Sequence, residues 1–515
     1  MSPEGAGTGS RDGVRRLGEG GLGWALAAAA LAAGVVLRFV APADLWLDEA
    51  QSVAIARLPL PQLLEALRQD GSPPLYYLLL HGWTAVVGEG APAVRALSGL
   101  FSVLSLPLAW VLGRRVAGPR GGVALVLLLA ASPFAVRYAS ETRMYALVVL
   151  LVLLAGLAVD RAVRRPGPGS VAAVALATGA LLLTHYWAAH LVLVAGLLAV
   201  AGLRRDRRAA GRVLTGLVLG GVLFLPWVPS LLVQVSSTGT PWAAVGGLSA
   251  IPTALTAWQG GGTLGAVLLG HALVFLAVLA LVAVPVPGAW GSPTVGLGRV
   301  RGLLPWALLA LSLGTLVVGG LASWVTGSAV SPRYTSVALP AFLALVAIGL
   351  AALPGRRVSA ALLAVVVLLG LGVAAGKVRT PRTQAGEVAA ALGEAAPGDV
   401  VAFCPDQLGP AVSRLAPRGL DLVVYPDLRP ADRVDWTDYA ERNEAGDPAA
   451  TAAELDARAV RGAVWVVTGS GFRVPPDADC RALRGALAEL RGEPEQVVER
   501  RPSVGEGMRL HRFAG

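Results

Sequence analysis

Residues 22–49 read LGWALAAAALAAGVVLRFVAPADLWLDE, an apolar run that ends in two adjacent carboxylates, Asp48 and Glu49. The part from 22 to 40 is long enough to cross a bilayer as a helix, for which roughly 20 apolar residues suffice. Carboxylates that directly follow such a run are costly to hold beside hydrocarbon, so they are candidates for a functional site. The stretch therefore predicts a membrane-spanning helix with chemistry at its exit.

The composition is that of a membrane protein. Of the 515 residues, 55% are hydrophobic and 15% are charged, against about 25% charged in soluble proteins. Residues 1–380 contain 27 Lys and Arg against 12 Asp and Glu (+15), and residues 381–515 contain 16 against 21 (−5), which together give the net charge of +10. The positive charge lies in short loops between apolar runs and not on a soluble domain, so we expect no nucleic-acid partner.

Hydropathy predicts a mainly α, polytopic membrane protein with about eleven spans. They are expected at 22–40, 92–112, 121–136, 144–159, 171–183, 188–203, 213–232, 263–284, 303–325, 335–353 and 358–375. With this set, the strongly basic loops at 114–120, 161–165, 204–212 and 356–357 all lie on one side, which the positive-inside rule makes cytoplasmic. Residues 1–21 are then a disordered cytoplasmic N-terminus, residues 22–379 form the membrane domain, and residues 380–515 lie outside.

Two interfacial helices are expected in the first outer loop. Apolar residues near helical spacing over 53–67, flanked by charges, predict an amphipathic helix on the membrane face. After the break at Pro73-Pro74, residues 75–87 are apolar but too short to span comfortably. Their aromatic content also suits an interface. The alternative, a genuine span at 75–87, would invert everything downstream and place the basic loops outside.

The outer tail, residues 380–515, is predicted to be a small α/β domain. Short apolar runs at 400–403, 420–425 and 464–468 predict buried strands, and residues 387–392, 407–415 and 480–490 predict helices. Residues 426–450, rich in Asp, Pro and Glu, predict a long surface loop. The cysteines Cys404 and Cys480 form either one disulfide or two buried thiols, and sequence alone does not decide between them.

Ionisable residues gather at the outer ends of the spans. The set comprises Asp48, Glu49, Arg137, Glu141, Arg143, His185 and Arg333. Each has an ordinary explanation: an Arg at a span end is usually a membrane anchor, a His among aromatic residues belongs to the interfacial belt, and an acid pair can cap a helix. Their joint occurrence on the less basic side favours a functional site.

Several motifs resemble the GT-C superfamily of polyprenyl-phosphate-sugar glycosyltransferases, in particular its dolichyl-phosphate-mannose–protein mannosyltransferase-like branch. They are Trp46-Leu47-Asp48-Glu49 after the first span, Ser72-Pro73-Pro74-Leu75-Tyr76-Tyr77, Ser132-Pro133 with Arg137-Tyr138-Ala139-Ser140-Glu141-Thr142-Arg143-Met144-Tyr145-Ala146-Leu147, and Ser331-Pro332-Arg333-Tyr334. The resemblance is specific over residues 40–150, weaker over 150–330, and absent from the tail.

The resemblance implies an inverting transfer of a sugar, with mannose favoured, from a polyprenyl phosphate to a hydroxyl acceptor outside the membrane. Such a reaction needs a general base for the acceptor hydroxyl, and Asp48 matches the family's acidic position. Glu49 is then an orienting neighbour or a helix cap. Arg333, followed by Arg143 and His185, suits the phosphate leaving group. Glu141 is assigned to the acceptor or to a cation.

The remaining expectations concern substrate contacts, cofactors and partners. Tyr76, Tyr77, His81 and Tyr138 are expected to line the substrate site. A monophosphate donor requires no metal, so none is favoured, although a divalent ion is compatible with the carboxylates. The expected partners are the lipid-linked donor, a glycan, lipid or protein acceptor, and the bilayer. Two competing readings are a transporter or flippase, and a membrane scaffold whose tail binds glycan.

Overall fold

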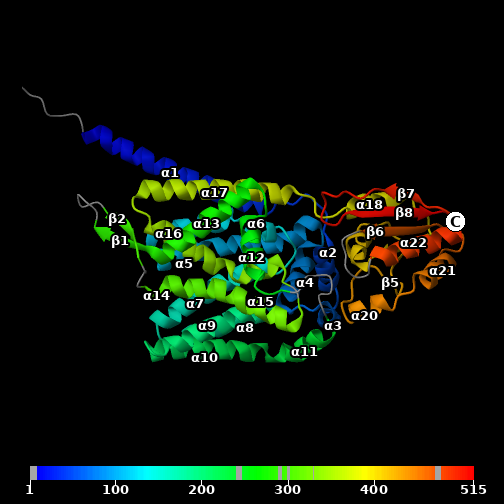
Figure 1. Ribbon diagram of the computed structural model, residues 1–515, viewed down its shortest axis with the longest axis horizontal. Helices are drawn as coiled ribbons and strands as arrows, with labels where there is room; N and C mark the ends of the chain where they lie inside the picture. Colours follow the sequence, from blue (N-terminus) through cyan, green and yellow to red (C-terminus); the bar gives the residue numbers. More distant parts are fainter. Residues whose placement is uncertain (1–8, 239–245, 288–292, 299–301, 329, 470–476) are drawn as a thin grey trace, which may run out of the picture.

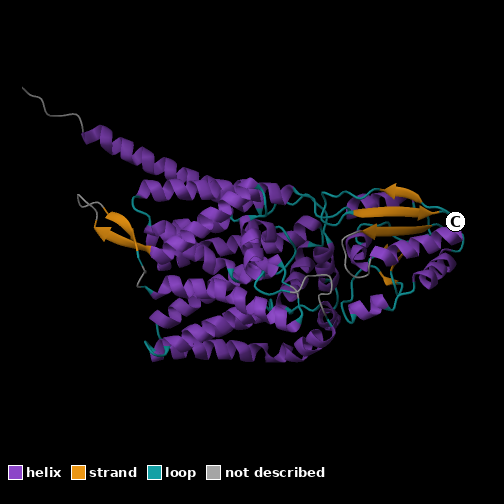
Figure 2. Ribbon diagram, viewed as in Figure 1, coloured by secondary structure: helices purple, strands orange, loops and turns teal. Residues whose placement is uncertain are grey.

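The structure is a computed structural model that describes residues 9–238, 246–287, 293–298, 302–328, 330–469 and 477–515. A bundle of helices makes up most of the molecule, and a smaller domain of strands and helices lies at one end of it (Figures 1 and 2). The chain reaches this domain only after the last long helix of the bundle, and its C-terminus lies at the far end. The division near residue 380 is therefore visible as a change from helices to mixed structure.

The bundle consists of apolar helices of different lengths, some of which are joined end to end. They are α1 (Gly9–Leu37), α5 (Ala91–Ala131), α7 (Tyr145–Arg164), α8 (Pro168–Leu182), α9 (Ala188–Gly202), α10 (Arg207–Phe224), α11 (Val228–Ser237), α13 (Leu264–Val282), α14 (Leu303–Leu309), α15 (Thr315–Thr326), α16 (Leu339–Ala352) and α17 (Arg356–Arg379). The 3₁₀ turn η1 (Leu225–Trp227) joins α10 to α11, and the π-helical turn η3 (Ala310–Gly314) joins α14 to α15.

Six helical segments in the described ranges are long and apolar enough to cross a membrane, and five further apolar helices have 10–17 residues. The prediction of a multi-pass membrane protein is confirmed, whereas helix length does not confirm the number eleven. The first helix also begins at Gly9, inside the segment expected to be disordered, and residues 1–8 lie outside the described ranges.

Helix α5 corresponds to two of the predicted spans, because its two halves are separated by a kink. Ala117 and Gly118 leave helical geometry, and Gly118 has a φ of +67°, which favours glycine. A Cβ atom on Gly113 would lie 2.4 Å from the carbonyl oxygen of Gly121, so the two halves touch through their backbones. Small residues allow this close approach between membrane helices.

Three short helices lie between the bundle and the terminal domain: α2 (Leu47–Ala56), α3 (Leu60–Asp70) and α4 (Leu75–Val87) (Figure 1). The bounds of α4 agree with the helix predicted at 75–87. The single helix predicted over 53–67 is wrong, because Pro59 precedes α3 and Pro61 lies in its first turn. Proline fits the start of a helix but not its interior, so the chain forms two helices here.

Further short elements cover the loops. The helices α6 (Pro133–Ala139) and α12 (Ala250–Gln259) and the turn η4 (Pro332–Val337) pack against one another or against α7. At the opposite end of the bundle, β1 (Ala283–Pro287) pairs antiparallel with β2 (Pro293–Leu297) (Figure 1). The end with α2–α4 is therefore the one that faces the terminal domain.

The terminal domain contains a six-stranded sheet in the order β5-β4-β3-β6-β8-β7. The strands are β3 (Val400–Cys404), β4 (Asp421–Val424), β5 (Arg429–Pro430), β6 (Val464–Gly469), β7 (Glu495–Val498) and β8 (Met508–Phe513). The central β4, β3 and β6 run parallel, and the outer pairings are antiparallel. The α/β prediction is thus supported, with the strands after residue 490 missed.

Helices cover both faces of this sheet, which suits the continuously apolar central strands. One face, with Val400 and Ala402, packs on α21 (Pro448–Ala459) and α22 (Asp477–Arg491). The other, with Val401 and Phe403, packs with α18 (Ala385–Ala391) and α19 (Gly409–Ser413). The short helices η5 (Leu392–Glu394), η6 (Asp406–Leu408) and α20 (Tyr439–Glu444) complete the domain.

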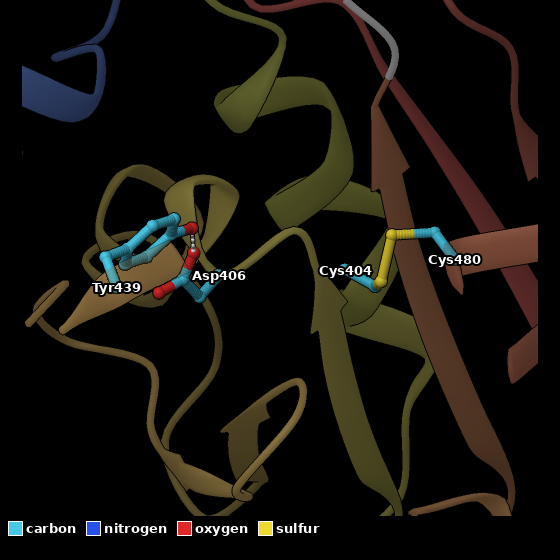
Figure 3. Close-up of a disulfide and its surroundings, with 4 residues drawn as sticks. All are labelled: Cys404, Asp406, Tyr439 and Cys480. Carbon is cyan, nitrogen blue, oxygen red and sulfur yellow. Dashed lines mark hydrogen bonds between the residues drawn. A yellow bond between two sulfur atoms is a disulfide. The ribbon is translucent and has the colours of Figure 1, made fainter. Parts of the chain in front are cut away.

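The two cysteines form a disulfide that ties the end of β3 to α22 (Figure 3). Of the two alternatives that the sequence left open, the structure has the disulfide. The long surface loop predicted over 426–450 is wrong: this segment contains β5, α20 and the start of α21. Asp447 caps α21 by accepting from the Ala449 and Ala450 amides. An acid-rich composition alone does not show whether an Asp caps a helix or lies in a loop.

Candidate active site

Asp48 lies in the first turn of α2, at the junction between the bundle and the terminal domain. The helix begins at Leu47 after Trp46, which contributes no side-chain cap, so the acid pair follows the cap instead of forming it. The Asp48 carboxylate forms an ion pair with the guanidinium of Arg333, which comes from η4. Their side chains are 15% and 19% exposed, so both remain accessible to a ligand.

Glu49, one residue further along, is enclosed by the protein. Its carboxylate accepts from Arg95 twice, at 2.7 Å to Nε and 2.6 Å to Nη2, and its Oε1 also accepts from the Thr142 amide at 2.9 Å. The side chain is 0% exposed. Arg95 also donates to the backbone carbonyls of Ala41, Ala43 and Asp44. Glu49 therefore joins α2 to α5 and to the loop before α7.

Arg143 approaches Asp48 from the loop before α7. Its Nη1 lies 3.0 Å from the Ser52 hydroxyl, 3.2 Å from the Tyr77 hydroxyl and 3.3 Å from the Asp48 carbonyl oxygen. Tyr77 in turn donates to Asp70 at 2.9 Å. This network holds one guanidinium beside the acid, and in the described ranges no carboxylate forms an ion pair with it.

The tyrosines of α4 lie behind this network. Tyr76 and Tyr77 are 0% exposed. The Tyr76 hydroxyl is 3.0 Å from that of Ser98, which donates to the Arg143 carbonyl oxygen. His81, on the same helix, contacts the Ala56 carbonyl oxygen at the end of α2. All three expected substrate-lining residues on α4 thus touch protein groups that position α2 and Arg143.

An aromatic row connects Tyr138 and His185 to Arg333. Ring centroids lie 5.1 Å apart for Tyr138 and Tyr145, 5.7 Å for Tyr145 and His185, and 5.2 Å for His185 and Tyr334. The Arg333 guanidinium carbon is 5.6 Å from the Trp46 ring and 6.0 Å from that of Tyr334. Both rings are within the range of cation–π attraction to this guanidinium.

His185 belongs to this row as a neutral ring. It lies in the loop between α8 and α9, where burial, with the charges of Arg143 and Arg333, lowers the pKa of His185 to about 3. Its Nδ1 accepts from the Trp187 amide at 3.1 Å, so Nε2 carries the proton. His185 can therefore donate a hydrogen bond to an anion but adds no charge.

Glu141 belongs to a second ion-pair cluster, which approaches the acid pair through Arg382. It pairs with Arg137 at 2.8 Å and approaches Arg382 at 3.5 Å. Arg382 follows α17, donates to the carbonyl and hydroxyl of Ser140 at 2.8 Å each, and lies 3.7 Å from Glu49. The Glu141 side chain is 1% exposed.

Three N–H donors around Asp48 are buried without a hydrogen-bond partner in the described parts of the chain: Trp46 Nε1, Arg143 Nε and Arg333 Nε. Buried donors are almost always paired, so unpaired ones indicate a ligand, an ion or water. Two of them belong to guanidinium groups, which bind phosphate and carboxylate oxygens. The arrangement is suited to an oxyanion beside a carboxylate base.

Sequence reasoning missed Arg95 and Arg382, which hold the two glutamates. Arg95 lies within a predicted span, and a charge inside an apolar run is a signal that could have identified it. Arg382 lies at the start of the tail and carries no local signal. Among the residues that the structure describes, no group of three or more His, Cys, Asp or Glu is placed to hold a metal ion.

A cleft of about 790 Å³ lies on the other side of α2. It is bordered by Ala50, Ala54 and Arg57 of this region and by residues of α19 and its flanks. Asp48 is two residues from Ala50, which on a helix is about 200° around the axis. The cleft is therefore separate from the environment of Asp48.

One family model matches part of the chain. Residues 71–229 match the family model described as dolichyl-phosphate-mannose-protein mannosyltransferase. The matched segment contains α4, Glu141, Arg143 and His185, but neither Asp48 nor Arg333. No curated protein sequence matches the chain.

Two solved structures are similar over almost the whole chain. They are ArnT from Cupriavidus metallidurans bound to undecaprenyl phosphate, with a TM-score of 0.55, and ArnT from the same organism in the apo state, with a TM-score of 0.59. Each is 14% identical and the alignment covers 97% of this chain and 99% of the other. The likeness is one of fold, and it extends into the tail. With the family model, it supports the resemblance to the GT-C superfamily.

Proposed function

We propose that this protein is a membrane glycosyltransferase that moves a sugar from a polyprenyl-phosphate donor to a hydroxyl acceptor, with inversion at the anomeric carbon. The observation that carries the proposal is Asp48, a partly exposed carboxylate paired with Arg333 and surrounded by unpaired N–H donors. A base beside an anion-binding group is what this reaction needs. The family match and the ArnT-like fold support the same class of reaction.

The donor is proposed to be a polyprenyl phosphate that carries a mannose-like sugar. The similar ArnT structure contains undecaprenyl phosphate, and the family model is named for a dolichyl-phosphate-mannose enzyme. Arg333 and Arg143 would contact the phosphate oxygens, with His185 as a neutral hydrogen-bond donor behind them. A monophosphate is satisfied by these groups, so no metal is assigned.

In the proposed step, the acceptor oxygen attacks the anomeric carbon as Asp48 removes its proton. The bond between that carbon and the phosphate oxygen breaks, and the electron pair leaves on the polyprenyl phosphate. The negative charge grows on the leaving phosphate, where cationic donors stabilise the transition state. The products are the glycosylated acceptor and polyprenyl phosphate, and Asp48 returns its proton to solvent.

The ion pair suggests an order of binding. While Asp48 is paired with Arg333, the guanidinium contacts the carboxylate and competes with an acceptor hydroxyl for it. A donor phosphate would compete for Arg333 and release Asp48. Deprotonation of the acceptor would then follow arrival of the donor, which limits wasteful attack by water.

The buried residues of the site are proposed to position these groups. Glu49 fixes α2 through Arg95, and Tyr76 and Tyr77 hold Arg143. Glu141 keeps Arg382 and Arg137 beside the loop before α7, and Tyr138 supports the aromatic row. We place this reaction on the extracytoplasmic face, with the N-terminus in the cytoplasm, because the basic loops lie on the other side. The acceptor is a hydroxyl of a glycan, lipid or protein.

The proposal is tested with Asp48→Asn in native membranes, supplied with radiolabelled polyprenyl-phosphate mannose. General bases contribute about 10²–10⁴-fold, so transfer should fall at least about 100-fold. The variant should nevertheless bind undecaprenyl phosphate several-fold more tightly in native mass spectrometry, because Arg333 is freed. Arg333→Ala should lose this binding.

The matched control is Glu65→Gln, an exposed acid on the neighbouring α3 that forms an ion pair with Arg68. It should retain wild-type transfer. Unchanged transfer by Asp48→Asn would remove the catalytic role of this residue. Absence of transfer by the wild-type protein with mannose and with amino-sugar or pentose donors would favour a transporter or flippase.

A further inference from the structure

The terminal domain makes polar contacts with α2, the helix that carries Asp48. The Glu506 carboxylate oxygen Oε1 accepts from the Leu47 amide at 2.9 Å. The side chain of Gln51 donates through Nε2 to the Val434 carbonyl oxygen at 2.8 Å, and its Oε1 accepts from the Val434 backbone amide at 2.9 Å. Leu47 is also packed against Val434, Trp436 and Tyr439. Residues far apart in the sequence thus hold both the first turn and the middle of α2.

Glu506 is well placed to act on this helix. Its own amide donates to the Arg382 carbonyl oxygen at 2.8 Å, and its carbonyl accepts from the Gln384 amide at 3.1 Å, so its backbone is fixed to the segment after α17. Its side chain is 8% exposed. The charged groups that face it are Asp48 and Glu49, the second of which is neutralised by Arg95 and Arg382.

Helix α2 requires such support. It has 10 residues, and its N-cap residue, Trp46, makes no side-chain hydrogen bond to the helix. Isolated helices of this length are marginal, and the first amides of a helix need acceptors. Glu506 accepts from the first helical amide, adjacent to Asp48. A carboxylate or carboxyl oxygen at this point acts as a cap that comes from another domain.

We propose that Glu506 is a positioning residue for the transfer reaction, and that the terminal domain completes the active site by fixing the first turn of α2. The inference rests on the proposed function, because it assigns the purpose of this contact to the placement of Asp48. Misplacement of a reacting group by about 1 Å lowers turnover strongly without removing substrate contacts. Loss of the cap should therefore act on kcat and leave donor KM nearly unchanged.

The test compares Glu506→Ala, Glu506→Asp and Glu506→Gln in the full-length protein in lipid nanodiscs, with polyprenyl-phosphate mannose as donor. The Ala and Asp variants remove or retract the oxygen, and kcat should fall about 10- to 100-fold with donor KM within about 2-fold. Gln retains an acceptor oxygen, so it should restore at least half of the wild-type kcat. Glu493→Ala, an exposed acid of the same domain, is the control.

A second readout does not depend on activity. Hydrogen exchange measured by mass spectrometry should increase over residues 46–56 in the Ala and Asp variants, and remain at the wild-type rate in the Gln variant and in the control. Unchanged exchange there, or unchanged kcat in Glu506→Ala, would overturn the positioning role. If exchange changes as expected but Asp48→Asn retains transfer, the proposed base fails while the contact between the domains stands.

Discussion

At the scale of single residues, two adjacent carboxylates acquire different environments from helix geometry. Successive side chains on a helix point about 100° apart, so Asp48 and Glu49 cannot face the same neighbours. Asp48 is directed to Arg333 and stays partly exposed, whereas Glu49 is directed to Arg95 and is 0% exposed. A charge that is fully buried and accepts three hydrogen bonds acts as a structural link, and the partly exposed one is available for chemistry.

This difference predicts opposite effects on stability. Glu49→Gln leaves the Arg95 guanidinium buried with an incomplete partner, which should destabilise the protein by about 3–5 kcal/mol. Asp48→Asn should change stability by less than about 1 kcal/mol, because its pair is partly exposed. Thermal unfolding in detergent micelles measures both. The double variant Glu49→Gln/Arg95→Met should recover part of the loss, and equal unfolding temperatures for Glu49→Gln and wild type would contradict the structural role.

At the scale of elements, the bundle depends on glycine where helices meet through their backbones. The two halves of α5 fold against each other at Gly113 and Gly121. Gly196 on α9, by contrast, has nothing within 4 Å of the position that a Cβ would occupy. Composition alone counts these residues as equivalent, although only the first kind carries a packing requirement.

Gly113 and Gly196 provide a matched test of whether the two halves of α5 must pack closely. Gly113→Ala places a Cβ 2.4 Å from the Gly121 carbonyl oxygen, so the halves must separate and the yield of monodisperse protein in size-exclusion chromatography should fall several-fold. Gly196→Ala should leave the yield unchanged or improve it, because alanine favours a helix by about 1 kcal/mol. Equal yields for the two variants would show that the close approach is not required.

At the scale of the whole molecule, the terminal domain contains two buried acids whose protonation responds to pH. Burial raises the pKa of Glu506 to about 8 and that of Asp406 to about 7. The Asp406 carboxylate accepts a hydrogen bond from the Tyr439 hydroxyl (Figure 3). This bond and the positive charge of Arg442 lower the pKa of Asp406, but burial raises it by more. Both pKa values lie above those of the unfolded chain, so the folded protein holds protons that the unfolded chain releases.

The sign of the pH dependence follows from this proton uptake. The contribution of these two acids to the free energy of unfolding should be most favourable below about pH 4 to 5. It should decrease as the pH rises, until the loss is complete above about pH 8. The loss is on the order of a few kcal/mol. The apparent unfolding temperature in nanodiscs should fall from pH 5 to pH 8.5 in the wild type, and fall less in Glu506→Gln/Asp406→Asn. A double variant with the wild-type slope would contradict the assignment.

Much of the architecture could be predicted because hydropathy and charge act locally. The apolar runs determined which segments become helices of the bundle, and the break at Pro73-Pro74 with the short run after it determined α4. Alternation of apolar strands and helices after residue 380 determined the α/β class. The predictions failed at 53–67 and 426–450, where prolines and capping residues set boundaries that composition does not resolve.

The candidate site was predicted as a set of residues, but only tertiary structure decided what each of them contacts. The sequence by itself predicted that Asp48, Glu49, Arg143, His185 and Arg333 occur at span ends, in or near motifs that resemble those of the GT-C superfamily. Pairing of Asp48 with Arg333, enclosure of Glu49 by Arg95, and capping of α2 by Glu506 join segments separated by 46 to 459 residues. Such contacts depend on how whole helices and domains pack, because no local pattern of residues encodes a partner that far along the chain.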